Sequence, residues 1–392
     1  MARSGADLAT ELTRVIDRES GAMRDLLAAL VAVPTENPPG RSYPACVELV
    51  ERALDRLSIA HERVGIPNAD AHNSAVFGSV GRTGPTLYLH GHYDVVPASV
   101  TGQFTPRIEG DTLFGRGSSD MKSGLVAMLY AAHALQSVGL PSRGRLGLVF
   151  VPDEETGGAG GSGALAAAGL LGRDAVGMLL PEPTSGVVWN ANRGAFTLEV
   201  TVKGRHAHVG LMQQGVNAFE RAVSVANELI ALERALAESG SLLLIGGRVE
   251  AGVNFNSVPA ECRFTIDRRT NPDEDFDAEK QRLLDVLQKA RRSGIDLDVR
   301  TIQEGRSAST PPDSELGRAL ADSIQTVTGE AAQFELCPGL LEIRFYAAQG
   351  VPALSYGPGI LAVSHGPQEF VRLSRMIECA KIYALTAARL LT

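Results

Sequence analysis

The chain has 392 residues, of which 44% are hydrophobic and 21% are charged. This length exceeds the roughly 250–300 residues at which a single hydrophobic core stops growing, so two domains are expected. The composition lies near the globular average, which excludes disordered, collagen-like and coiled-coil classes. With 37 basic and 45 acidic residues the net charge is −8. Nucleic acid and anionic membranes are therefore excluded as partners, and a small molecule is expected.

Four cysteines lie far apart in the sequence and form no CxxC pair: Cys46, Cys262, Cys337 and Cys379. This spacing predicts neither a disulfide framework nor a thiolate zinc site, and it favours a reducing compartment. No apolar stretch approaches the ~18 residues that span a bilayer. The first residues have a charged helical pattern and lack the apolar segment of a signal peptide. These features predict a cytoplasmic protein.

The first half of the chain alternates between helical and strand-like patterns. Apolar spacing predicts helices over 5–33 and 43–58, on either side of a Pro- and Gly-rich turn. Three strands and two intervening helices follow, over 85–96, 121–138, 143–152, 161–171 and 176–181. This alternation predicts an α/β fold with a mixed sheet flanked by helices, in which ligands bind beyond the carboxyl ends of the strands.

From residue 194 the pattern changes to βαββαβ. The predicted elements are strand 195–203, helix 213–237, strands 241–250 and 259–268, helix 273–293 and strand 297–303. This order matches the ferredoxin-like motif. The first style then resumes, with helices over 313–329 and near 341–349, strand 351–356 and a final helix from about 367. The sequence predicts one discontinuous catalytic domain, 1–193 and 306–392, with a second domain inserted at 194–305.

Five short motifs place oxygen and nitrogen ligands at predicted strand ends or loops. They are LHGHYDVVP with His92 and Asp94, GRGSSDMKSG with Asp120, VPDEETGG with Glu154 and Glu155, LLPEPT with Glu182, and SHGPQEF with His365. Two imidazoles and several carboxylates without thiolates suit Zn²⁺, Mn²⁺ or Co²⁺, and zinc is favoured for hydrolysis. The charges of two divalent ions and of Asp120, Glu155 and Glu182 leave about one positive charge for a bound hydroxide to neutralise.

These five motifs, in this order, resemble the M20 family of zinc-dependent amidohydrolases and peptidases. That family includes acetylornithine deacetylase, succinyl-diaminopimelate desuccinylase, aminoacylase and glutamate carboxypeptidase. The resemblance spans roughly residues 85–370, which includes both predicted domains.

The resemblance implies a role for each residue of the motifs. His92 and Glu182 would bind one metal, Glu155 and His365 the other, and Asp120 would bridge the two. Asp94 would accept the free ring N–H of His92, and Glu154 would be the general base. The family's bridging aspartate also implies a cis peptide bond between Asp120 and Met121.

In the inserted domain the resemblance implies a lid and dimerisation role. His208, in GRHAHVGLMQQGVNA, would stabilise the oxyanion from across a homodimer. Asn256 and Arg269 would hold the substrate's carboxylate, a task that suits the planar fork of Arg. The implied activity is hydrolysis of the amide bond of N-acyl-L-amino acids by a metal-bridged hydroxide with Glu154 as base. A dipeptidase or carboxypeptidase of the same family is the alternative.

Three alternatives remain open at this point. His90 shares a strand face with His92 and is a rival ligand. Gly158, Gly160 and Gly163 form GxGxxG after a strand, as in dinucleotide-binding folds, although three carboxylates precede them and would oppose a pyrophosphate. The chain could also be a metal-binding scaffold without activity. Departures from the family pattern at Tyr93, Leu211, Met212, Leu340, Leu341 and Glu342 allow an apolar substrate pocket.

Overall fold

The computed structural model describes residues 5–69, 72–237 and 240–392 of the chain. It divides into two compact units. Unit 1 comprises Met1–Ala191, Ser309–Leu336 and Glu342–Thr392, and unit 2 comprises Asn192–Ala308 with Cys337–Leu341. The main boundaries between the two units therefore lie at 191/192 and 308/309. The boundaries predicted from the sequence are 193/194 and 305/306.

Unit 1 is built on a nine-stranded mixed sheet with the order β1-β2-β6-β3-β7-β17-β8-β15, and β16 pairs with β8. Its strands are β1 (Ala60–Gly65), β2 (Ser74–Gly81), β3 (Thr86–His92), β6 (Arg145–Val151), β7 (Ala175–Leu180), β8 (Val188–Asn192), β15 (Ala308–Ser309), β16 (Phe334–Cys337) and β17 (Ala353–Ser355). A separate three-stranded sheet is formed by β4 (Arg107–Glu109), β5 (Thr112–Phe114) and β18 (Phe370–Arg372).

The centre of the large sheet is parallel, since β3 pairs in parallel with both β6 and β7, and β17 with β7. All seven residues of β3 are buried. Near-continuous apolar runs such as Leu146–Val151 are typical of strands that are covered on both faces. The predicted α/β class with a mixed sheet is confirmed.

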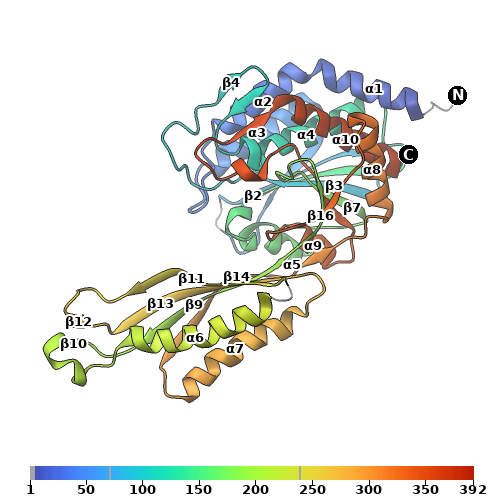
Figure 1. Ribbon diagram of the computed structural model, residues 1–392. Coiled ribbons are helices and arrows are strands. Elements are labelled where there is room, and N and C mark those ends of the chain that lie inside the picture. Colours follow the sequence, from blue (N-terminus) through green and yellow to red (C-terminus); the bar gives the residue numbers. More distant parts are fainter. Residues whose placement is uncertain (1–4, 70–71, 238–239) are drawn as a thin grey trace. The chain divides into compact units, whose positions relative to one another are not determined.

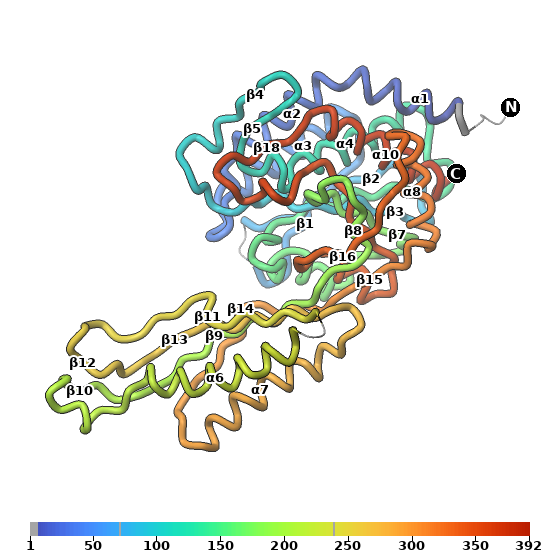
Figure 2. The backbone as a smooth tube through the Cα atoms, in the orientation of Figure 1, coloured from blue at the N-terminus to red at the C-terminus, as the bar shows by residue number. Residues whose placement is uncertain are grey.

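Helices cover both faces of this sheet (Figures 1 and 2). They are α1 (Gly5–Arg18), α2 (Ser20–Val31), α3 (Tyr43–Arg56), α4 (Ser123–Ser137), α5 (Ala164–Ala167), α8 (Glu315–Thr328), α9 (Ile343–Ala347) and α10 (Leu373–Leu391). Leu87 and Leu89 of β3 share one core with α1–α4, α8 and α10. Tyr88 and His90 point the other way, because side chains alternate along a strand, and both contact the ring of Tyr346 in α9.

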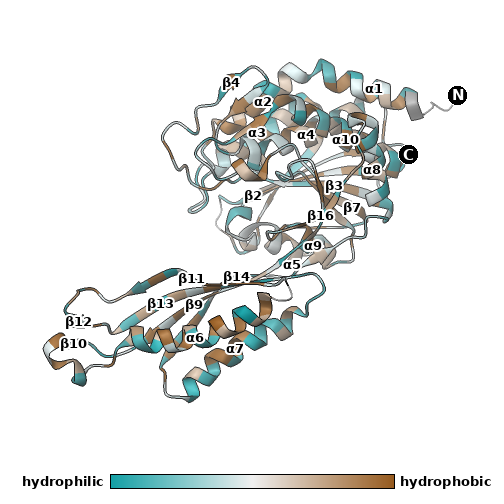
Figure 3. Cartoon of the chain, in the orientation of Figure 1, coloured by the Kyte–Doolittle hydropathy of each residue, from teal (hydrophilic) through white to brown (hydrophobic). Residues whose placement is uncertain are grey.

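Unit 2 has the predicted βαββαβ order. Its elements are β9 (Gly194–Lys203), β10 (Ala207–His208), α6 (Ala218–Ala237), β11 (Leu242–Ala251), β12 (Ser257–Val258), β13 (Glu261–Thr270), α7 (Phe276–Arg292) and β14 (Leu297–Gly305). The sheet order is β11-β13-β9-β14, with antiparallel pairing throughout. Helices α6 and α7 share a core with this sheet, and in Figure 3 each carries both apolar and polar residues along its length. The lid and dimerisation role of this unit stays a prediction.

Several predicted elements differ from the structure in length. The helix predicted over 5–33 is two helices, since α1 ends at Arg18 and α2 begins at Ser20, with Glu19 as its N-cap. The helix predicted over 161–171 contains only α5, since a glycine-rich turn occupies the residues before it. The helix predicted from 213 begins at Ala218, and the final helix begins at Leu373 after β18. The sequence reading missed β1 and β2, and it did not separate the short strands β4, β5, β8, β15, β16 and β18.

Across the described ranges, none of the helices has both the length and the apolar character required to cross a membrane.

Candidate active site

The candidate site lies at the carboxyl ends of three neighbouring parallel strands of unit 1. His92 is the last residue of β3, Glu154 and Glu155 follow the end of β6, and Glu182 follows the end of β7. Because β6, β3 and β7 are adjacent and parallel, these side chains reach the same edge of the sheet. Gly124 and Gly357 both lie against the carbonyl of Pro181, where a side chain would overlap it. Two close backbone approaches thus fix the segment that carries Glu182.

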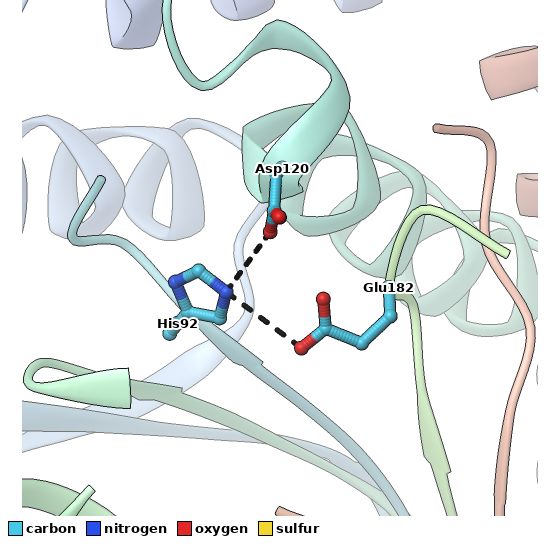
Figure 4. A group of neighbouring side chains, drawn as sticks. All are labelled: His92, Asp120 and Glu182. Carbon is cyan, nitrogen blue, oxygen red and sulfur yellow. Dashed lines mark ion pairs between the residues drawn. The ribbon is translucent and has the colours of Figure 1, made fainter. Parts of the chain in front are cut away.

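His92, Asp120 and Glu182 form the first group of potential metal ligands (Figure 4). The Nε2 atom of His92 is 3.3 Å from Oδ1 of Asp120 and 3.7 Å from Oε1 of Glu182. All three side chains are buried. These three atoms have no hydrogen-bond partner among the described residues. Three unsatisfied buried polar atoms that face one another are costly unless a further group binds them.

Asp120, Glu155 and His365 form the second group. The Nε2 atom of His365 is 3.3 Å from Oδ2 of Asp120 and 3.1 Å from Oε2 of Glu155. Asp120 therefore presents one carboxylate oxygen to each group, as a residue that bridges two cations would.

The two groups fit divalent metal ions. Nitrogen and oxygen ligands held about 2.0–2.1 Å from a tetrahedral ion lie roughly 3.3–3.4 Å from one another. The spacings between His92, Asp120, Glu155 and His365 are 3.1–3.3 Å, and that between His92 and Glu182 is 3.7 Å. Imidazole and carboxylate donors without thiolates suit Zn²⁺, Mn²⁺ or Co²⁺.

The pKa values of these groups reflect the excess of carboxylates. Burial raises the pKa of the Glu182 and Glu154 carboxyl groups well above their usual range. Burial alone would lower the pKa of His92, but the carboxylates of Asp120 and Asp94 raise it well above its ordinary value. The carboxylates of Asp120 and Glu155 raise the pKa of His365 to about 10. Without a cation, the cluster therefore binds protons.

Asp94 lies behind His92, on the side away from the two groups. The Nδ1 atom of His92 is 3.0 Å from the backbone carbonyl of Asp94 and 3.4 Å from its carboxylate. The Asp94 carboxylate also accepts the backbone N–H groups of Glu154 and Glu155, both at 3.2 Å. Asp94 thus connects the segment of His92 to the turn that carries Glu154 and Glu155. Hydrogen bonds of this kind fix the tautomer and orientation of a ligating imidazole.

Glu154 lies beside the first group without belonging to it. Its Oε2 atom is 4.0 Å from Nε2 of His92, and its side chain is 17% exposed. It is thus close to the first group of potential ligands and partly exposed to solvent.

His90 belongs to a separate buried network. Its Nε2 atom contacts Oε2 of Glu342 at 3.0 Å and Oγ of Ser162 at 2.9 Å, and its Nδ1 atom contacts the hydroxyl of Tyr346 at 3.0 Å. Both ring nitrogens are therefore engaged within the protein, and His90 is in neither ligand group.

Comparison with known proteins identifies the family. The sequence profile of peptidase family M20/M25/M40 matches residues 88–389 of this chain. The chain belongs to this family. The succinyl-diaminopimelate desuccinylase of Marinobacter nauticus is 28% identical over 364 residues, covering 88% of this chain and 93% of the relative. The acetylornithine deacetylase of Myxococcus xanthus is 27% identical over 388 residues, covering 94% and 97%.

The fold also matches solved M20 structures. The M20 metallo-carboxypeptidase Sso-CP2 of Sulfolobus solfataricus superposes with a TM-score of 0.78 at 17% identity, covering 94% of this chain and 99% of that one. The predicted resemblance to the M20 family is confirmed, and with it the prediction of a hydrolase. The alternative that the chain is a metal-binding scaffold without enzymatic activity is therefore disfavoured.

Two M20 motifs also contribute a buried ion pair that the sequence reading did not identify. Arg116 of GRGSSD and Glu369 of HGPQE lie 2.6 Å apart, and both are buried. Glu369 accepts the backbone N–H groups of Ser119 and Asp120, and Arg116 donates to the carbonyl of His365. The pair therefore joins the segments of the two potential ligands Asp120 and His365. In the sequence, only the position of Arg116 and Glu369 within these two motifs indicated that they belong to the site.

The peptide bond between Asp120 and Met121 is cis, as the family resemblance implies.

The glycine motif is not arranged to bind a dinucleotide. The backbone N–H of Gly160 donates to the Asp153 carboxylate at 2.6 Å, and that of Gly163 donates to the carbonyl of Gly158. These amides are thus used within the loop, and a carboxylate already occupies the position that a phosphate would need.

The three predicted substrate-binding residues lie in unit 2. His208 is exposed on β10, which pairs with β12, and its Nδ1 atom accepts the N–H of Gly210. Asn256 immediately precedes β12, and its carbonyl accepts the N–H of Val209. Arg269, on β13, forms two hydrogen bonds with the carboxylate of Asp267, at 2.8 and 2.9 Å. The structure thus brings His208 and Asn256 together, whereas the fork of Arg269 has an internal partner.

Proposed function

We propose that this M20 enzyme hydrolyses the amide bond of N-acyl-L-amino acids. The observation that carries the proposal is the sharing of Asp120 between two ligand groups, with the carboxylate of Glu154 beside them. Relatives named as a desuccinylase and a deacetylase support this substrate class. The cytoplasm is the proposed location.

The proposed cofactors are two divalent ions, with Zn²⁺ favoured over Co²⁺ or Mn²⁺. His92, Asp120 and Glu182 would hold one ion, and Asp120, Glu155 and His365 the other. When bound, such a pair lowers the pKa of a water molecule toward ~7 and polarises the scissile carbonyl.

The proton transfers are assigned to Glu154. Its carboxylate would accept a proton from the attacking water as the water oxygen bonds to the carbonyl carbon. The same group would then donate that proton to the amine nitrogen as the C–N bond breaks. Burial raises the pKa of Glu154, which makes this carboxyl group a better base and keeps the proton available for the leaving amine.

The substitution Glu154→Gln tests this role. It keeps the shape of the side chain and removes the base, so kcat for the best N-acyl amino acid should fall by about 10²–10⁴-fold with metal content unchanged. Glu109→Gln, on the exposed strand β4, is the matched control and should retain activity. Full activity in Glu154→Gln would refute the mechanism.

The alternative is a dipeptidase or carboxypeptidase activity, and the likeness to a metallo-carboxypeptidase is the observation in its favour. Metal-reconstituted enzyme should therefore be assayed with acetyl, succinyl and longer acyl amino acids beside a set of dipeptides. We expect the acyl amino acids to give the higher kcat/KM. A 100-fold preference for dipeptides would replace the proposed activity with the alternative one.

A homodimer is proposed through unit 2. Strand β11 is at the edge of the sheet and carries the exposed apolar residues Leu242, Leu244 and Val249. Phe219 and Val223 of α6 are also exposed. An exposed apolar edge strand is a site for pairing with another chain. Leu244→Lys should therefore give a monomer by light scattering, whereas Ile108→Lys in unit 1 should not change the mass.

In this dimer His208 is proposed to stabilise the oxyanion of the partner's site, and Asn256 and Arg269 to bind the substrate's carboxylate. Complementation tests the role of His208. Inactive Glu154→Gln and His208→Ala chains, mixed and allowed to exchange, should restore activity at roughly a quarter of the sites, because one site of each mixed dimer is complete. If His208 acts within its own chain, mixing restores nothing.

A further inference from the structure

Asn37 lies in the loop between α2 and α3 and is only 5% exposed. Its backbone N–H donates to the carbonyl of Val95 at 2.8 Å, and a β-bridge joins Glu36 to Val95. The loop is therefore attached to the segment that directly follows Asp94. This attachment fixes the position from which the Asn37 side chain points.

The side-chain amide of Asn37 faces two carboxylates at once. Its Nδ2 atom is 2.9 Å from Oδ2 of Asp94, 3.3 Å from Oδ1 of Asp153 and 3.2 Å from Oγ1 of Thr156. An amide has two N–H groups, so three acceptors share them. A neutral donor thus separates two negative groups that would otherwise repel each other.

Asp94 extends this contact to the proposed catalytic groups. Its Oδ1 atom accepts the N–H of Glu154, and its Oδ2 atom accepts the N–H of Glu155 together with the amide of Asn37. The ring of His92 lies 3.4 Å from the same carboxylate. No hydrogen bond joins Asn37 to His92, Glu154 or Glu155, yet Asn37 donates to Asp94, which contacts all three.

We propose that Asn37 is a positioning residue of this site. It holds Asp94 and the turn 153–156 in one arrangement, so that His92, Glu154 and Glu155 keep their relative positions. This proposal rests on the proposed function, because it takes His92 and Glu155 as metal ligands and Glu154 as the base, and gives Asn37 the task of holding them in position. It concerns the donor property of the amide as well as its volume.

Two substitutions separate donor from volume. Asn37→Ala removes both, whereas Asn37→Leu keeps a similar volume, removes the donor and adds no charge next to Asp94 and Asp153. Both should therefore be impaired, and a role in filling space alone would leave Asn37→Leu close to the wild type. Asn190, a half-buried residue of β8 whose amide donates to the carbonyl of Thr310, supplies the matched controls Asn190→Ala and Asn190→Leu.

The first measurement is zinc affinity, by competition of the full-length metal-free protein with a chromophoric chelator. Loss of a residue that supports metal ligands costs about 10–100-fold in affinity. We expect a loss of this size in Asn37→Ala and wild-type affinity in the Asn190 variants. Equal affinity in the wild type and both Asn37 variants would overturn the proposal.

The second measurement is turnover at saturating zinc. Because Asn37 does not contact the substrate, kcat should fall about 10–100-fold while KM changes little. A merely structural role would lower the melting temperature and leave kcat per folded, metal-loaded site unchanged. If Asn37→Ala fails to fold, Thr156→Val serves in its place. Thr156 is exposed, and its substitution removes one hydrogen-bond partner of the Asn37 amide, so kcat should fall by a smaller factor.

Failure of the proposed function is distinguishable from failure of this inference. If the wild type binds zinc but hydrolyses no amide, the proposed function fails and the zinc affinities still decide the role of Asn37. If the wild type hydrolyses its substrate and the Asn37 variants match it in both measurements, only this inference fails. If the wild type binds no zinc, both fail.

Discussion

In unit 2 the guanidinium of Arg268 is buried on β13 and bonds to the carboxylates of Glu274 and Glu279, while Arg282 pairs with the second of these. In unit 1 a second cluster brings together seven titratable groups, of which four are buried, two are partly buried and one is about half exposed: Asp94, Asp120, Glu182 and His92, then Glu154 and Glu155, and then His365. The first cluster has equal numbers of opposite charges. With its five carboxylates ionised, the second keeps three negative charges even with both imidazoles protonated.

This difference separates a structural cluster from a functional one. A buried charge that is paired within the chain supports the fold, whereas a buried excess of one sign is costly unless a ligand of the other sign binds. The unit 1 cluster also has three polar atoms that face one another without a hydrogen-bond partner among the described residues. Charge balance and unsatisfied polar atoms therefore indicate the same place as the candidate cation site.

The largest expected effect on stability is in the balanced cluster. Arg268→Met removes the buried cation between Glu274 and Glu279 and leaves only the half-exposed Arg282 to pair with Glu279, which should lower the free energy of unfolding by about 3–5 kcal/mol. Urea denaturation measures the change. Arg263→Met, on the same strand but half exposed, should cost less than about 1 kcal/mol. Equal losses in both variants would contradict the structural role of Arg268.

The unbalanced cluster should respond to metal instead. Zinc at about 100 times its dissociation constant should stabilise the protein by ~2.7 kcal/mol per site, because it binds only the folded state. Thermal denaturation with and without a chelator measures the effect. Arg268→Met should show the same increment, since neither group of potential metal ligands among the described residues lies in that cluster. A melting temperature that zinc does not raise would remove the distinction between the clusters.

The sequence predicted those residues of the candidate site that lie at or just after the ends of strands. Charged residues that directly follow the apolar strands β3, β6 and β7 must meet at one edge once these strands are parallel. His92, Glu155 and Glu182 follow from that argument. Asp120 and His365 do not, because neither lies at the end of a strand of the large sheet: Asp120 lies in the helical turn before α4 and His365 in the segment before β18, so only the family motifs indicated a role for them.

The remaining features depend on contacts between distant segments. Nothing local to Arg116 indicates that it pairs with Glu369, and nothing local to Asn37 indicates that it contacts Asp94. The strand β1 was missed because it is largely exposed and carries His61, Glu62 and Arg63 in place of an apolar alternation. Unit 2 was predictable because its helices and strands are long and strongly periodic.

Removal of one carboxylate should change the free energy of unfolding by a smaller amount, and in opposite directions in the two clusters. Glu182→Gln removes a carboxylate that burial disfavours, so the metal-free protein should gain roughly 0.5–2 kcal/mol of stability while zinc affinity falls. Glu279→Gln removes a partner of Arg268 and should destabilise by about 1–3 kcal/mol. Urea denaturation with a chelator present compares the two. Destabilisation of the same size in both variants would show that the clusters do not differ.

The smallest effect is a pH dependence of the metal-free protein. The pKa of His365 is raised to about 10 in the folded state, against about 6.5 in an unfolded chain. Its stabilising contribution is therefore complete below pH ~6.5 and is lost as the pH rises toward 10. The raised pKa values of Glu154 and Glu182 act in the same direction, above the unfolded value of ~4.3.

One proton corresponds to at most ~1.4 kcal/mol per pH unit, and the slope should be smaller here because half of the His365 side chain is exposed to solvent. Urea midpoints measured with a chelator should fall from pH 6.5 to 9. Zinc should reverse the trend, because metal binding requires deprotonated ligands and becomes tighter as the pH rises. The lowered pKa of Asp120 acts only in acid, outside this window. A metal-free protein whose stability stays level or rises from pH 6.5 to 9 would mean that the buried carboxylates do not hold these protons.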